Sequence, residues 1–148
     1  MILSLEDLLS DKQAITASAV STNIKDFGLA GTPVNRALPT GGVAQLVADQ
    51  GKGEPLPFLF QVNETFDALT SLEVQIQKSV DAAFTSPIVV QSQVLLLADL
   101  VIGQMGEIQW APLKLDLQFM RMNYIVTGTN PTVGQVTAGF SMGNQTNE

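Results

Sequence analysis

The sequence predicts an all-β fold, an antiparallel β-sandwich of the jelly-roll type with about eight strands. Short runs of alternating apolar and polar residues recur along the chain, most clearly in residues 58–63 and 72–77. Clusters of turn residues separate these runs, as in residues 128–131, which read Gly-Thr-Asn-Pro. No long segment has the apolar period of a helix, so βαβ units are not expected. We expect one domain, residues 1–148, which is long enough to enclose a core.

Residues 1–12 are expected to form an N-terminal arm or a short helix. Ser4 followed by Asp7 resembles a capping box. A helix here would place three leucines on one face: Leu5, Leu8 and Leu9. The segment could dock on a neighbouring protein or pack on the sheet as a terminal turn, and the sequence leaves both open.

The chain then changes from extended structure to a long loop. Residues 14–27 are small and β-branched, which favours extended chain, and Gly28 ends this segment. Residues 29–57 are rich in Pro and Gly and are expected to form a long loop, with a short apolar segment at residues 43–47. A loop of this length is either functional or partly disordered.

The remaining sequence predicts strands followed by a tail. The runs at residues 58–63 and 72–77 have one apolar and one polar face, so both strands should be half-buried. Residues 143–148 offer no apolar anchor and are expected to be flexible. Four further strands are expected: residues 87–97, 114–120, 122–127 and 135–142.

The composition argues against most enzyme classes. The chain has no Cys and no His, which removes disulfides, Cys or His zinc sites, nucleophilic cysteines and histidine bases. We therefore expect a protein that is not an enzyme and has no cofactor and no resident metal. A calcium site in a β-sandwich would leave no local signature, so that alternative stays open.

Charge and hydropathy also limit the partners. A formal charge of −7, with scattered Lys and Arg, opposes binding to nucleic acid. The first residues lack the basic segment of a secretory signal. The most apolar stretch, residues 88–105, is interrupted by Gln, Ser and Asp, so no membrane segment is expected. We expect a soluble protein made without export.

One catalytic pattern occurs literally. Residues 139–143 read Gly-Phe-Ser-Met-Gly and match the nucleophile elbow G-x-S-x-G. That elbow needs a downstream His, which the chain lacks, so a strand containing glycine is the better interpretation. Glu64, Asp67 and Glu73 could supply an acid and a base near one hairpin, but turn and surface positions explain them equally well.

The two ends of the chain carry a family resemblance. Residues 8–19 read LLSDKQAITASA and lead into Ser-Thr-Asn at residues 21–23. Near the other end, residues 124–132 read YIVTGTNPT and residues 135–139 read QVTAG. These segments resemble the cement, or decoration, proteins of tailed-bacteriophage capsids. The resemblance implies a jelly roll, made in the host cytoplasm, that lies on the outer surface of the virion capsid and binds the major capsid protein. It also implies that copies join neighbouring capsomers, often as homodimers.

The N-terminal arm and the long loop are expected to contact the capsid, and an apolar sheet face or residues 88–101 to pair two copies. A homodimer is the expected oligomer, with a trimer as the alternative. Another virion part of similar fold, in the tail, neck or fibre, is the main alternative function. A carbohydrate-binding module is a weaker one, because the chain has only one Trp and one Tyr. The expected interface residues are Leu5, Leu8, Leu9, Phe27, Arg36, Lys52, Val94, Leu96 and Trp110.

Overall fold

Strands dominate the computed structural model of this chain. A single turn of 3-10 helix, η1 (Leu97–Asp99), is the only helical element among the residues that the structure describes. No helix in the same residues is long and apolar enough to cross a membrane. The described residues are 3–27, 36–37, 43–44, 56–108, 110–111 and 117–141.

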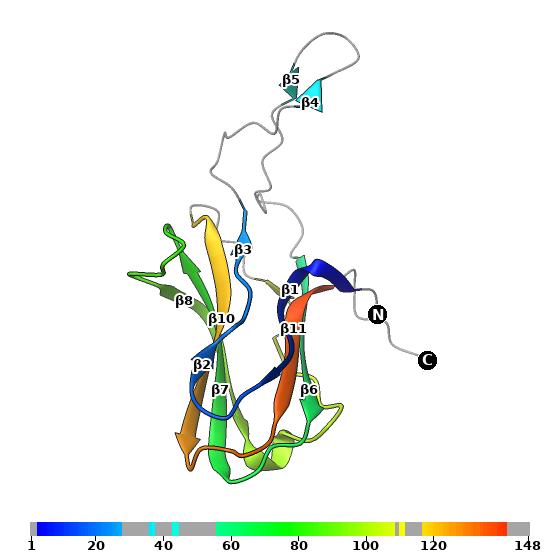
Figure 1. The fold of residues 1–148 in the computed structure, drawn as a ribbon, viewed down its shortest axis with the longest axis vertical. Coiled ribbons are helices and arrows are strands. Elements are labelled where there is room, and N and C mark those ends of the chain that lie inside the picture. Colours follow the sequence, from blue (N-terminus) through cyan, green and yellow to red (C-terminus); the bar gives the residue numbers. More distant parts are fainter. Residues whose placement is uncertain are drawn as a thin grey trace.

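Two antiparallel sheets pack face to face (Figure 1). We call them sheet A and sheet B. Sheet A has the order β1 (Leu3–Ala14), β11 (Gln135–Ser141), β6 (Leu56–Glu64) and β9 (Trp110–Ala111). Sheet B has the order β2 (Ala19–Val20), β10 (Phe119–Gly128), β7 (Leu69–Ser79) and β8 (Ile88–Leu96), and β3 (Lys25–Asp26) also pairs with β10.

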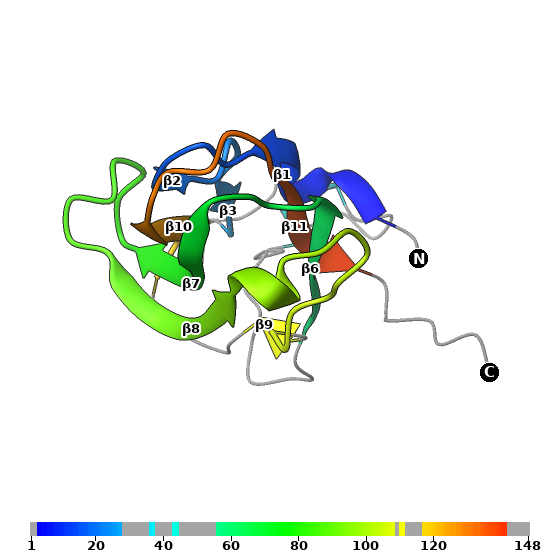
Figure 2. The same ribbon diagram turned by 90° about the horizontal axis from the view of Figure 1, so that it is seen from below.

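The strand order is that of a jelly roll. The first strand, β1, lies beside the last, β11, and the short strands β2 and β3 lie beside β10, the last strand but one. Counted with β2 and β3 as one position, each sheet has four positions. Figure 2 looks toward the ends of the strands and shows β1, β11 and β6 as one layer and β10, β7 and β8 as the other. The all-β, jelly-roll prediction is confirmed.

The core lies between the two sheets, because alternate side chains of each strand point inward. Tyr124 and Met122 of β10 and Val136 and Ala138 of β11 are fully buried there. The alternation that the sequence predicts for β6 and β7 is present, and these residues are buried: Phe58, Phe60, Val62, Leu72, Val74 and Ile76.

The predicted N-terminal helix is wrong, since these residues form β1. Backbone pairing with β11 gives hydrogen-bond partners to N–H and C=O groups of this segment. A short terminal helix would leave many of these groups without a partner. The adjacent Leu8 and Leu9 point to opposite faces of the strand, with Leu9 in the core. A helical face shared by the leucines therefore does not exist.

Other boundaries differ from the predictions in smaller ways. A break at Arg121 was expected, but β10 runs through it, because this side chain lies on the outer face and donates from Nε to Gln77 Oε1 at 2.9 Å. β6 begins at Leu56, two residues before the predicted strand, and so includes the last two residues of the predicted loop. Within that loop, β4 (Arg36–Ala37) and β5 (Val43–Ala44) pair as antiparallel strands.

Several predictions fall on residues outside the described part. These are most of the long loop, including Lys52, the first half of the strand expected at residues 114–120, and the tail at residues 143–148. The predicted strands at residues 87–97 and 135–142 are confirmed as β8 and β11.

Candidate binding surfaces

Three of the expected interface residues are buried in the fold, so their assignment to a surface is corrected. Leu9 and Phe27 belong to the core, with 1% and 7% of their surface exposed. Leu8 lies outside that core, beside Gly139 of β11, and is also buried. A hydrophobic residue near the chain terminus is a weak signal for an interface, because an edge strand needs the same residue for packing.

The side chains of four other expected residues lie outside the described part of the structure. Leu5 lies in β1, the backbones of Arg36 in β4 and Trp110 in β9 pair with neighbouring strands, and Lys52 lies outside the described residues. Their roles at an interface stay predictions.

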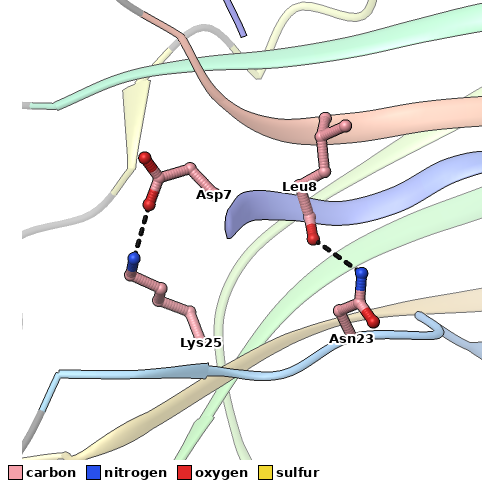
Figure 3. Close-up of polar contacts among 4 residues, drawn as sticks. All are labelled: Asp7, Leu8, Asn23 and Lys25. Carbon is pink, nitrogen blue, oxygen red and sulfur yellow. Dashed lines mark hydrogen bonds and ion pairs between the residues drawn. The ribbon is translucent and has the colours of Figure 1, made fainter. Parts of the chain in front are cut away.

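The N-terminal strand is fastened on both sides. β11 pairs with one edge of β1, and residues 22–25 form hydrogen bonds and an ion pair with residues of β1 on its other side. Asn23 donates from Nδ2 to the Leu8 carbonyl at 3.0 Å and from its backbone N–H to the Leu9 carbonyl at 2.9 Å. Lys25 forms an ion pair with Asp7 (Figure 3). From Asp7 onward this segment is thus a fixed part of the domain and not a free arm.

Gln13 fixes the turn that leads from β1 to sheet B. Its Oε1 accepts from Ser10 Oγ at 2.8 Å and from the Thr22 backbone N–H at 3.0 Å, while its Nε2 donates to the Val20 carbonyl at 2.8 Å. Ser10 also contacts Tyr124 Oη at 2.7 Å. The residues that carry the resemblance at the N-terminal end therefore hold the fold together.

Most of the exposed large apolar residues in the described part of the chain lie on or after β8. Val94 and Leu96 are 58% and 57% exposed. They pair with Glu73 and Ser71 of β7, which places them on the outer face of sheet B. An apolar group left this exposed on a regular strand is a candidate contact surface. These two predicted interface residues are thus accessible, and their partner stays a prediction.

A ladder of polar side chains continues this outer face across β7 and β10. Gln75 donates from Nε2 to Glu73 Oε1 at 2.8 Å and accepts at its own Oε1 from Asn123 Nδ2 at 2.9 Å. Gln77 donates from Nε2 to Gln75 Oε1 at 3.2 Å and accepts from Arg121. The ladder already holds these side chains in place, so binding of a partner here would cost little side-chain conformational entropy. The alternation in residues 72–77 predicted a polar face but not these cross-strand bonds.

A groove runs along the edge of β8 that pairs with no described strand, and no pattern in the sequence predicted it. One wall is made by residues 91–95 of β8, and its volume is about 570 Å³. The segment that follows η1 makes the opposite wall and pairs with β6 through Met105 and Gln61. Figure 2 shows this segment crossing in front of β6 and then returning toward β9. We call this feature the edge groove.

The carboxylates considered as an acid and base pair lie in three different settings: Glu64 ends β6, Asp67 lies in the β6–β7 connection and Glu73 lies in β7. Asp67 accepts from the Thr132 hydroxyl at 2.6 Å and from the Thr132 and Val133 N–H groups. These bonds, led by the Thr132 hydroxyl, lower the pKa of Asp67. Asp67 therefore ties the β6–β7 connection to the β10–β11 connection. Glu73 belongs to the outer ladder, and no group of three potential ligands for a metal occurs in the described part of the chain.

The first three residues of the G-x-S-x-G match lie in a strand. Gly139 to Ser141 are the last residues of β11, and the other two residues of the match lie outside the described part of the chain. Gly139 is required by close packing, because a Cβ at this position would lie 2.6 Å from the Asp7 carbonyl oxygen.

A family model matches most of this sandwich. The Bbp16 family covers residues 9–140, from the second half of β1 to the end of β11, so the chain belongs to the Bbp16 family. This family is phage-associated. A search of curated proteins finds no match.

Proposed function

We propose that this protein is a structural component of a phage virion that binds the outer surface of the head and cements neighbouring major capsid proteins. Membership of a phage-associated family is the observation that carries the proposal. The jelly roll supports it as a rigid platform, because the described candidate surfaces are faces and edges formed by strands. In this role the protein would act by binding, without catalysis or a cofactor.

Cementing requires contacts with more than one subunit, and the surface offers two adjoining places for them. The outer face of sheet B combines exposed Val94 and Leu96 with the polar ladder, and the edge groove continues from it along β8. Each contact can be modest, because binding at one surface raises the effective concentration at the next. A standard interface buries roughly 800 Å² per partner.

The direct test adds purified protein to heads that lack it. We expect saturable co-sedimentation and a higher temperature of head disruption. Heads that already carry a full complement are the control and should take up no more. Absence of co-sedimentation would contradict the proposal, and binding confined to the neck or tail in electron micrographs would favour a different virion role.

We also propose self-association, as a homodimer or alternatively a trimer. Light scattering coupled to size-exclusion chromatography measures the mass directly. The double variant Val94→Ser/Leu96→Ser should weaken self-association, head binding or both, while Val133→Ser, at another exposed valine, should change neither. If the double variant matches the wild type in both assays, these two residues are not at an interface.

A further inference from the structure

The free edge of β8 is unusual for a soluble sandwich. β8 pairs with β7 on one side, and no described strand lies on the other. Its residues, Ile88–Leu96, include no charged side chain and no Pro, the features that usually protect an exposed edge from pairing. A bulge at Val90 interrupts the strand, which leaves residues 91–96 as a regular stretch.

The edge groove follows this same stretch. Five consecutive residues, 91–95, line it, so the groove runs along the backbone edge of the strand. Its opposite wall is held at a fixed distance, because Gln93 Oε1 accepts from the Glu107 backbone N–H at 2.8 Å. Leu95 and Ile108, both buried, also line the groove. An extended chain could thus pair with β8 while its inward side chains enter the groove.

The charges in the groove indicate what those inward side chains should be. Asp99 and Glu107 line it, and no Lys or Arg is among the described residues that do. A second copy of β8 would bring no cation, because Ile88–Leu96 contains none. A segment of another polypeptide that carries Lys or Arg would complement the two carboxylates.

We propose that the edge groove binds an extended segment of a partner polypeptide, which adds a strand to β8 and places a Lys or Arg side chain beside Asp99 and Glu107. Side chains alternate along a strand, so the neighbours of this cation would lie beside Val94 on the outer face and should be apolar. The identification of the partner as a capsid subunit rests on the proposed function, whereas the strand addition itself does not.

A defined peptide tests the groove without the capsid. The probe is a synthetic peptide of about ten residues with alternating Val and Thr and one central Arg. The control peptide has Glu in place of this Arg and is otherwise identical. We expect the Arg peptide to slow hydrogen exchange at backbone amides of residues 91–96. Its dissociation constant should be lower than that of the Glu peptide by about fivefold or more, as expected for exposed charge pairs.

Variants of the two carboxylates test whether the groove causes the preference for the Arg peptide over the Glu peptide. The double variant Asp99→Asn/Glu107→Gln should abolish the preference for Arg over Glu, while Asp11→Asn, which removes an exposed charge on β1, should leave it unchanged. The proposal is overturned if neither peptide binds, if protection maps away from β8, or if the double variant keeps the preference. Concentration-dependent protection of β8 without peptide that persists in Val94→Ser/Leu96→Ser would also overturn it, since a second copy would then occupy the edge itself and not the outer face. Failure to bind heads would instead count only against the proposed function.

Discussion

Tyr124 joins the two sheets through a hydrogen bond in the interior. Ser10 has one hydroxyl hydrogen, and it donates this hydrogen to Gln13 Oε1. The orientation of the Gln13 amide is fixed, because its Nε2 donates to the Val20 carbonyl. Tyr124 Oη, 2.7 Å from Ser10 Oγ, is therefore the donor between these two hydroxyls. One polar chain thus connects β10, β1 and the turn before β2.

Removing the Ser10 hydroxyl should destabilise the fold more than removing the Tyr124 hydroxyl. Tyr124→Phe leaves Ser10 still bonded to Gln13, so we expect a loss of about 1 kcal/mol in the free energy of unfolding. Ser10→Ala leaves the Tyr124 hydroxyl buried without its acceptor, and should cost about 1–3 kcal/mol. Urea denaturation measures both. The double variant should cost less than the sum of the two, and strict additivity would show that the hydroxyls do not interact.

The stability of the wild type should fall at high pH because of Tyr124. Burial raises the pKa of Tyr124 above the ordinary tyrosine value of 10.0. The neutral phenol is therefore favoured in the folded state, and this contribution is full below pH 10 and lost as the pH rises above it. The chain has one tyrosine, so tyrosinate absorbance reports on Tyr124 alone. We expect tyrosinate to appear together with unfolding, and titration near pH 10 in a folded protein would contradict burial.

Asp67 gives a prediction at the opposite end of the pH scale. Its bonds to Thr132 and Val133 lower its pKa in the folded state, so they stabilise the fold above the unfolded pKa and fail as the pH falls through the folded value. In Thr132→Ala the largest of these bonds is lost, and the carboxyl should titrate closer to 3.8 by NMR. An unchanged titration would mean that Thr132 does not hold this carboxylate in solution.

At the scale of elements, β1 is the strand on which sequence and structure differ most. The sequence showed its leucines, but the spacing of Leu5, Leu8 and Leu9 fits a helix as well as a strand. The free edge of β11 decides between them, because its backbone groups need partners. That information lies more than a hundred residues away and is not local. Deletion of residues 1–10 would remove Leu9 from the core and Ser10 from Tyr124, so such a variant would report on folding and not on a docking arm.

The close contact between β1 and β11 can be tested at Gly139. Gly139→Ala would place a Cβ 2.6 Å from the Asp7 carbonyl oxygen and 2.8 Å from Leu8 Cα, which are backbone atoms that cannot move without shifting β1. We expect a loss of about 1–3 kcal/mol in the free energy of unfolding and faster hydrogen exchange at residues 8–10. Wild-type stability in this variant would show that β1 does not pack as closely as described.

At the scale of the whole molecule, the alternation in β6, β7 and β11 was enough to predict a sandwich. The same patterns could not predict the edge groove. It depends on how the segment after η1 returns to β6, as seen in the bond from the Gly106 N–H to the Phe60 carbonyl. Most of the expected interface residues are hydrophobic, and hydrophobicity does not distinguish core residues such as Phe27 from exposed ones such as Val94.

The position of the protein in the particle tests the cement role most directly. A cryo-EM map of the virion should show the sandwich at repeated sites over the whole outer surface of the head, each copy in contact with at least two neighbouring capsid subunits. Density for the sandwich only at the neck, tail or fibres, or on single subunits without bridging, would contradict this role.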